Sequence, residues 1–162
     1  MIQAVIVTVS DSAVARTRAD RSGPALRERL EALGWTIRAQ ELVPDERNEI
    51  AAVLKRWSDE PESLVILTTG GTGVALRDIT PEATRGVIER EVPGLGELMR
   101  AEGRHQTPFA VLSRGLAGIR GRSLIVNLPG SPKGAVESLD SIAKLIPHII
   151  DLLEGRTSHG SG

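Results

Sequence analysis

The chain contains no cysteine, and its aromatic side chains are limited to Trp35, Trp57 and Phe109. Without a thiol it can form no disulfide, no thiolate zinc site and no cysteine nucleophile. Three aromatic side chains are too few for a platform on which nucleic-acid bases stack. The 20 basic and 21 acidic residues give a formal net charge of -1, which supplies no general attraction for nucleic acid. We therefore expect no nucleic-acid partner.

Long hydrophobic runs are also missing. The apolar stretches at residues 64–67 and 124–126 are far shorter than the roughly 20 residues that a membrane helix needs. The first residues, Met1 to Val7, carry no basic region and lead directly into a predicted strand, which differs from a secretory signal. The expectation is a protein without membrane contact, located in the cytoplasm.

Two common catalytic arrangements are absent as well. The three histidines, His105, His148 and His159, do not have metal-ligand spacing. The sequence contains no Gly-x-Ser-x-Gly nucleophile elbow. A length of 162 residues with 40% hydrophobic content suits one domain with a single core. We expect this domain to cover residues 1–155 and the Gly- and Ser-rich end, 156–162, to be disordered.

Short apolar segments alternate with helical patterns along the chain. Residues 4–9, 64–67 and 124–128 are nearly continuously apolar, as in strands covered on both faces, and residues 36–43 suit a strand nearer the sheet edge. Helices are expected to begin at or near Ser22, Ile50, Thr80, Pro93 and Ser131. Ser22 and Thr80 are the expected N-caps, and Pro147 is expected to kink the last helix. This alternation predicts an α/β fold of three layers, a mostly parallel sheet with helices on both faces.

A glycine-rich turn follows the strand at residues 64–67. In an open parallel sheet, ligands bind beyond the carboxyl ends of the strands, so this loop lies where a site is expected. Gly70, Gly71 and Gly73 allow backbone amides to approach an anion, while Thr69 and Thr72 add hydroxyl donors. The loop matches neither a Walker A motif nor a complete dinucleotide fingerprint. It predicts a phosphate cradle, with a simple tight turn as the alternative.

The residues after this loop strengthen the phosphate interpretation. Arg77 and Asp78 precede a helix that begins at Thr80, and a cation beside a helix N-terminus favours an anion. Asp78 could hold Mg²⁺ against substrate phosphates, since magnesium typically uses one or two carboxylates plus the phosphates. Alternatively, Asp78 caps the helix and pairs with Arg77.

A second group of candidates follows the strand at residues 124–128. Pro129, Gly130, Ser131 and Lys133 occupy the start of the last helix, where a hydroxyl, free amides and a cation can bind phosphate. Alternatively, Ser131 is an N-cap followed by Pro132. Two anion sites at two strand ends indicate a ligand with more than one phosphate.

Three further polar residues are expected at the same edge of the sheet. Ser10 and Asp11 end the first strand, and Asp45 precedes the second predicted helix, where N-capping is its alternative role. The arginines at positions 16, 18 and 21 follow in a loop that could close over phosphate or remain solvated.

In order along the chain, the segments 68–73, 77–83 and 128–134 resemble the molybdopterin-binding family of molybdenum cofactor biosynthesis. The resemblance covers about residues 2 to 155. Ser10-Asp11-Ser12, Asp20 to Pro24 and Val43-Pro44-Asp45 also occupy the family's places. Each piece is weak alone, but the ordered combination is specific.

The resemblance implies a compact α/β fold, usually a homotrimer, that adenylylates molybdopterin with Mg-ATP and releases pyrophosphate. It implies that the Gly70–Gly73 loop and Ser131 bind phosphate or pterin groups. It also implies that Asp45 and Asp78 are the acidic residues needed for transfer, with Mg²⁺ as their metal. The wider substrate- and nucleotide-binding set then comprises Ser10, Asp11, Thr69, Gly70, Gly71, Thr72, Gly73, Arg77, Thr80, Pro129, Gly130, Ser131 and Lys133.

Two other functions remain open on the sequence. The region after Lys133 runs directly into one helical pattern, as in shorter paralogues, so a non-catalytic molybdopterin carrier is the first alternative. The second is a nucleotide-processing domain like that found beside pyridine-nucleotide amidases, although the usual second domain is absent.

Overall fold

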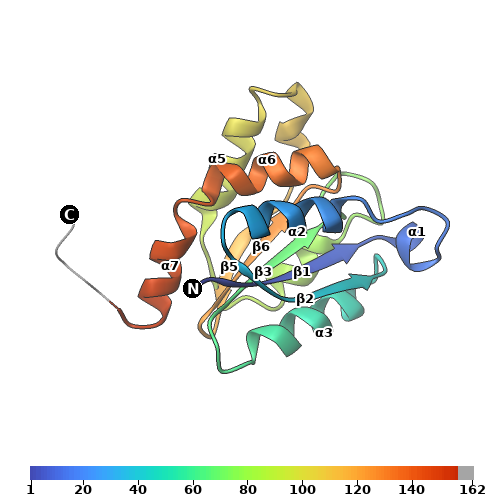
Figure 1. Ribbon diagram of the computed structural model, residues 1–162. Helices are drawn as coiled ribbons and strands as arrows, with labels where there is room; N and C mark the ends of the chain where they lie inside the picture. Colours follow the sequence, from blue (N-terminus) through green and yellow to red (C-terminus); the bar gives the residue numbers. More distant parts are fainter. Residues whose placement is uncertain (157–162) are drawn as a thin grey trace.

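The structure, a computed structural model, describes residues 1–156, so the expected disordered tail lies outside the described part from residue 157 onward. Strands and helices alternate along most of the chain (Figure 1). The strands are β1 (Gln3–Val9), β2 (Thr36–Val43), β3 (Leu64–Thr69), β4 (Arg90–Glu91), β5 (Ala117–Arg120) and β6 (Ser123–Leu128). The helices are α1 (Asp11–Val14), α2 (Ser22–Ala32), α3 (Arg47–Ser58), α4 (Thr80–Arg85), α5 (Pro93–Gly103), the 3-10 helix η1 (Pro108–Leu112), α6 (Pro132–Ile142) and α7 (Ile146–Leu153). Within residues 1–156, none of these helices has the length and apolar character needed to cross a bilayer.

All six strands form one sheet in the order β2-β1-β3-β6-β5-β4. The pairs β1–β2, β1–β3 and β3–β6 are parallel, whereas β5 and β4 add antiparallel pairs at one side. The predicted mostly parallel α/β sheet is confirmed, and residues 36–43 form an edge strand as expected. The chain passes from β1 to β2 on one side and then to β3 on the other side of β1. In open α/β sheets, the crevice at such a reversal is where ligands bind.

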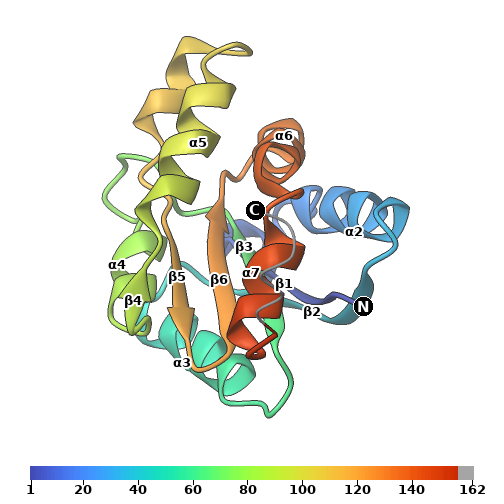
Figure 2. The same ribbon diagram turned by 90° about the vertical axis from the view of Figure 1, so that its left-hand side faces the viewer.

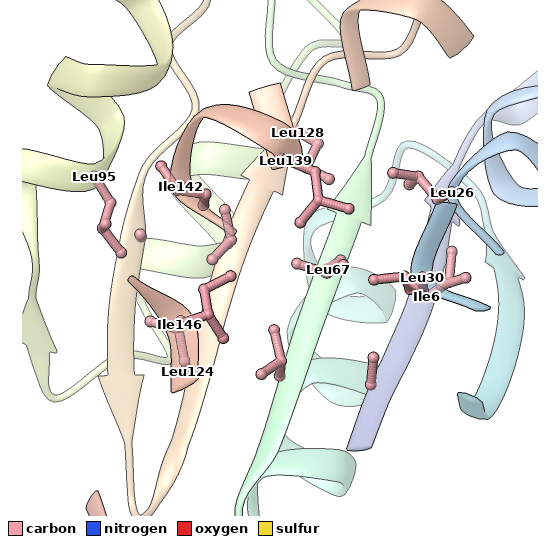
Figure 3. Packing of buried hydrophobic residues seen from close by; sticks show 14 of the residues in the cluster. Ile6, Leu26, Leu30, Leu67, Leu95, Leu124, Leu128, Leu139, Ile142 and Ile146 are labelled. Atoms are coloured by element: carbon pink, nitrogen blue, oxygen red, sulfur yellow. The ribbon is translucent and has the colours of Figure 1, made fainter. Parts of the chain in front are cut away.

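Each face of the sheet carries its own apolar core, because neighbouring side chains of a strand point to opposite faces. In β1, Ala4 and Ile6 belong to one core, and Val5 and Val7 belong to the other. Helices α2, α5, α6 and α7 contribute to the first core, which Figure 3 shows from close by, and α3 and α4 contribute to the second. Figures 1 and 2 show these helices on the two sides of the sheet. The predicted three layers are confirmed, and burial on both faces explains the continuous apolar runs.

The part of the chain after β3 differs from the sequence prediction in several elements. The sequence pattern through Ile88 suggested a longer helix, but the helix that begins at Thr80 ends at Arg85, and the chain then leads into the two-residue strand β4. Neither β4 nor the four-residue β5 was predicted, since such short strands show no readable periodicity. A short helix was expected from Pro93, but α5 spans 11 residues. Pro147 lies in the first turn of a separate helix, α7, where its missing amide proton is not needed.

Two of the expected N-caps have other roles. Ser22 is the first residue of α2, and the carboxylate of Asp20 accepts the amide of Gly23 at 3.0 Å and the Ser22 hydroxyl at 3.4 Å. Thr80 is the first residue of α4, and its hydroxyl donates at 2.9 Å to a carbonyl of the glycine loop instead of capping the helix. The prediction of these two caps was wrong because another acceptor, Asp20 for Ser22 and the Gly70 carbonyl for Thr80, takes each hydroxyl.

Candidate functional site

The carboxyl ends of β1, β3 and β6 meet at the point where the strand order reverses. The amide of Gly70 donates to the carbonyl of Leu128 at 3.1 Å. A Cβ atom at Gly70 would lie 2.3 Å from the carbonyl oxygen of Val9, and one at Gly130 would lie 3.3 Å from the Cα of Gly70. Gly70 also has a φ of +104°, which other residues rarely adopt. Position 70 therefore requires glycine, and three loops form one continuous surface.

Threonine hydroxyls hold the glycine loop in place. Thr69 donates to the carbonyl of Pro129 at 2.7 Å, and Thr80 donates to the carbonyl of Gly70 at 2.9 Å. Both protons are thus used within the protein, which differs from the expected role of Thr69 as a free hydroxyl donor. Thr72 is buried, and its hydroxyl makes no hydrogen bond within residues 1–156. Of the two expected threonine donors, Thr72 is the one that stays free for a ligand.

Two cavities open on this surface and share a wall. The first, of about 550 Å³, lies between the glycine loop, the α5–η1 segment and the start of α6. The predicted site residues that line it are Gly71, Thr72, Gly73, Asp78, Pro129, Gly130 and Ser131. The second cavity, of about 620 Å³, lies between the end of β1 and the start of α2, and Ser10, Thr69, Gly70, Gly130 and Ser131 line it. Gly130 and Ser131 therefore separate the two cavities.

Asp45 lies beside the glycine loop without lining either cavity. A Cβ atom at Gly71 would lie 3.1 Å from Asp45 Oδ1, while Asp45 Oδ2 accepts the amide of Asp11 at 3.0 Å. Burial raises the pKa of the Asp45 carboxyl, the Asp11 amide opposes this increase, and the negative charges of Asp11 and Asp78 add to it. Residue 46 occupies the N-cap position of α3, so the alternative interpretation of Asp45 as an N-cap is wrong.

Arg77 joins the glycine loop to the loops after β1 and β2. Its guanidinium donates to Asp11 Oδ2 at 2.6 Å and Oδ1 at 3.2 Å, to the Asp45 carbonyl at 3.1 Å and to Glu46 Oε1 at 3.1 Å. The hydrogen bonds from Arg77, followed by that from the Asp45 amide, lower the pKa of the Asp11 carboxyl. The expected alternative pair between Arg77 and Asp78 is not formed. Within residues 1–156, Nη1 of Arg77 makes no hydrogen bond, so this nitrogen is the part of the guanidinium left for a phosphate.

Asp78 lies in the wall of the first cavity. Its Oδ2 accepts the amide of Ala75 at 3.0 Å, and a Cβ atom at Gly73 would lie 2.8 Å from the same oxygen. Within the described residues, no hydrogen bond uses Asp78 Oδ1. The N-cap position of α4 belongs to Ile79, so Asp78 does not cap this helix. One of its carboxylate oxygens is therefore available to a ligand.

Ser131 caps α6 by accepting the amide of Gly134 at 3.1 Å, which confirms its alternative interpretation as an N-cap. A hydroxyl that accepts one hydrogen bond can still donate its own proton. Capping and anion binding are therefore compatible at this residue. Lys133 is 82% exposed, lies 3.8 Å from Glu137 and lines neither cavity.

Asn127 lines the first cavity but was not among the predicted site residues. Its buried amide donates to the hydroxyls of Thr68 at 3.0 Å and Thr84 at 2.9 Å. Its Oδ1 accepts the amide of Leu116 at 3.3 Å. These bonds join β3, α4 and the segment before β5. An asparagine inside an apolar run was the available sequence signal, since a buried polar side chain needs partners.

Arg114 is a second residue that sequence reasoning missed. It follows η1, and its guanidinium reaches the carbonyls of Gly73 and Asp78 and the carboxylate of Glu82. A single arginine in an irregular segment carries no recognisable pattern, so only the structure reveals these contacts.

The two predicted metal ligands flank the glycine loop. Within residues 1–156, no group of three or more His, Asp or Glu side chains is placed to hold a metal ion. Asp45 Oδ1 and Asp78 Oδ1 are nevertheless free of hydrogen bonds in this part of the chain. Because Mg²⁺ usually combines one or two carboxylates with waters and substrate phosphates, this donor set fits an ion that shares its coordination with a nucleotide.

Residues 5–148 match the family described as "Probable molybdopterin binding domain". The chain belongs to this family. A Helicobacter pylori J99 protein named molybdopterin adenylyltransferase is 45% identical over 152 residues, covering 93% of this chain and 86% of that protein. The Drosophila melanogaster molybdenum cofactor synthesis protein cinnamon is 46% identical over 149 residues, 91% of this chain. This chain spans only 25% of the Drosophila protein.

A solved structure agrees with this family membership. The chain is 53% identical to the molybdopterin biosynthesis enzyme MoaB from Thermus thermophilus, with a TM-score of 0.89. The match covers 96% of this chain and 98% of that one. The resemblance inferred from the three motif segments is therefore confirmed.

Proposed function

We propose that this protein transfers the adenylyl group of ATP to molybdopterin and releases pyrophosphate. The observation that carries the proposal is that Thr72, Asp78 and Ser131, from the loop after β3 and the start of α6, line one cavity. The relative that is 45% identical over 86% of its own length, and is named molybdopterin adenylyltransferase, supports the choice of substrates.

The geometry suits nucleotidyl transfer without a covalent enzyme intermediate. A phosphate oxygen of molybdopterin attacks the α-phosphorus of ATP, the bond from this phosphorus to the bridging oxygen breaks, and pyrophosphate leaves with that oxygen. The amides of Gly71, Thr72 and Gly73 and the N-terminus of α6 would hold the phosphate groups, since the Gly70 amide already donates to Leu128. Such transfer depends mainly on positioning and on stabilisation of negative charge.

Magnesium, held by Asp45 and Asp78, would neutralise charge that develops on the leaving pyrophosphate. Burial raises the pKa of Asp45, and a bound cation would offset this effect because it favours the charged carboxylate. Thr72 and Ser131 would orient phosphate oxygens through their hydroxyl protons, and Ser131 would contact groups in both cavities.

We further infer a homotrimer and a cytoplasmic location, which rest on the resemblance to the family. Light scattering measures the first directly: a mass about three times 17.3 kDa is expected, and a monomer would contradict it. Fractionation of cells that produce the protein tests the second.

The activity is tested by incubating the protein with molybdopterin and Mg-ATP and measuring pyrophosphate. Asp78→Ala should lower the rate about 100-fold or more, because charge stabilisation of this kind supplies several kcal/mol. The matched control is Asp140→Ala, which removes an exposed aspartate that pairs with Arg29 far along α6. Wild-type protein that releases no pyrophosphate above an enzyme-free control rejects the proposal. If, in that case, wild type and Asp78→Ala bind molybdopterin with equal affinity, the non-catalytic carrier is favoured.

A further inference from the structure

The segment from Gly73 to Asp78 forms part of the first cavity wall but has little packing of its own. The side chain of Val74 is 71% exposed, and that of Leu76 is 99% exposed. Two hydrogen bonds join Ala75 and Asp78 to each other across the turn, at 3.0 Å each. These local bonds shape the turn but do not fix it relative to the rest of the protein.

Within residues 1–156, every hydrogen bond from elsewhere in the protein to the backbone of this segment comes from Arg114. Its Nε donates to the Gly73 carbonyl at 2.7 Å, and its Nη2 donates to the Asp78 carbonyl at 2.5 Å. The two carbonyls belong to the first and last residues of the segment. One guanidinium therefore holds both ends of the turn that carries Asp78.

Arg114 is itself fixed on both sides. Its amide donates to the carbonyl of Thr72 at 2.8 Å. Its Nη1 and Nη2 donate to the carboxylate of Glu82, in the first turn of α4, at 2.7 and 3.1 Å. The bond from Arg114 lowers the pKa of the Glu82 carboxyl, so the pair stays charged at neutral pH. The guanidinium thus links the segment to a helix on the sheet.

We propose that Arg114 is a positioning residue for adenylyl transfer, which places the Asp78 carboxylate in the cavity by holding the Gly73 and Asp78 carbonyls. The inference rests on the proposed function. The chemistry requires arginine, because a planar fork donates in several fixed directions, whereas a lysine ammonium cannot reproduce this geometry. Without the fork, the only remaining hydrogen bonds within residues 1–156 that tie the turn to the rest of the protein are those of the Arg77 side chain, so Asp78 can shift relative to the phosphates.

The experiment compares Arg114→Gln and Arg114→Lys with wild type in the pyrophosphate assay. The matched control is Arg85→Gln, which removes an exposed arginine of the same helix region that pairs with Glu91. The kcat of Arg114→Gln should fall about 10- to 100-fold, as expected when a reacting group is displaced by about 1 Å, with the KM for ATP changed less than about threefold. Arg114→Lys should recover only part of this loss.

Hydrogen exchange followed by mass spectrometry provides a readout that does not depend on activity. In Arg114→Gln, peptides covering residues 73–78 should exchange faster, while peptides from β1, β3 and β6 should keep the protection of wild type. Arg85→Gln should match wild type throughout. If Arg114→Gln does not fold, Glu82→Gln replaces it, because this change removes the carboxylate that fixes the guanidinium and should loosen the same peptides.

The outcomes separate the inference from the function on which it rests. If wild type releases no pyrophosphate, the proposed function fails. If exchange at residues 73–78 is also the same in Arg114→Gln as in wild type, Arg114 does not hold this segment and the positioning role fails as well. If wild type is active and Arg114→Gln keeps kcat within about twofold, the positioning role is overturned while the function stands. A loss of kcat together with faster exchange across the whole fold would show a general structural role and also overturn it.

Discussion

Asp11 and Asp45 are held by each other's backbone: the Asp45 amide donates to Asp11 Oδ1 at 2.9 Å, and the Asp11 amide donates to Asp45 Oδ2 at 3.0 Å. This reciprocal pair joins the loop after β1 to the loop after β2. It fixes Asp45 beside Gly71 without using Asp45 Oδ1. The same arrangement places two carboxylates close together. Of these two carboxylates, Arg77 donates hydrogen bonds only to that of Asp11.

Asp45→Asn should abolish most of the activity but increase stability at neutral pH. The pKa of Asp45 is raised in the folded protein, first by burial, so folding opposes its ionisation. The folded state then binds more protons than the unfolded state as pH rises past the ordinary value of 3.8, and stability falls through this window. The asparagine oxygen can still accept the Asp11 amide.

Urea denaturation of wild type and Asp45→Asn at pH 7 and pH 3 measures this effect. The variant should be the more stable protein at pH 7, and the difference should shrink at pH 3, where the carboxyl is protonated in both states. An Asp45→Asn protein that is less stable than wild type at pH 7 would contradict the assigned cost of the buried charge.

Gly71→Ala should destabilise the glycine loop. Gly71 has a φ of +68°, and an added Cβ would lie 2.3 Å from Thr80 Oγ1. Backbone strain of this kind costs about 1–3 kcal/mol in the free energy of unfolding, and displacement of the loop should also lower activity. The control is Gly94→Ala in the first turn of α5, where the added Cβ would have no atom within 4 Å apart from its own helix turn and chain neighbours. Chemical denaturation that finds equal stability for both variants would argue against strain at Gly71.

Two substitutions at Ser131 separate capping from anion binding. Ser131→Ala removes the cap of α6 and should cost about 1 kcal/mol of stability, together with the hydroxyl donor. Ser131→Asp keeps an acceptor for the Gly134 amide and suits the helix dipole, so stability should be retained. Its negative charge should nevertheless repel a phosphorylated substrate and raise the KM about tenfold, which corresponds to about 1.4 kcal/mol. Unchanged KM values in Ser131→Asp would leave Ser131 with the capping role alone.

Asn127→Ala should lower both stability and activity. The change leaves the Leu116 amide without its acceptor and removes the donor to Thr68 and Thr84 in a fully buried position. Leaving a buried polar group unpaired costs about 1–3 kcal/mol, measurable as a lower urea midpoint with an unchanged m-value. Asn48→Ala, on the exposed face of α3, should change stability by less than about 0.5 kcal/mol. If Asn127→Ala also changed stability by less than about 0.5 kcal/mol, other groups would have to replace the hydrogen bonds of Asn127.

Local sequence patterns predicted much of this molecule. The strands β1, β3 and β6 and the glycine loop were located because continuous apolar runs and glycine clusters are visible over a few residues. The predictions of N-caps at Ser22 and Thr80 were wrong, because Asp20 and the Gly70 carbonyl compete for their hydroxyls. The antiparallel edge formed by β4 and β5 depends on pairing between distant short segments, which local periodicity does not contain.

The sequence by itself determined which residues end the central strands and where backbone must approach backbone, since glycines and apolar runs act through local sterics and burial. Only the tertiary structure decided the partners of the charged groups. Arg77 binds Asp11 across 66 residues, and Arg114 reaches Gly73 across 41. A guanidinium has several donors and pairs with whichever acceptors the folded chain brings within about 3 Å, so its partner is a property of the assembled sheet and loops.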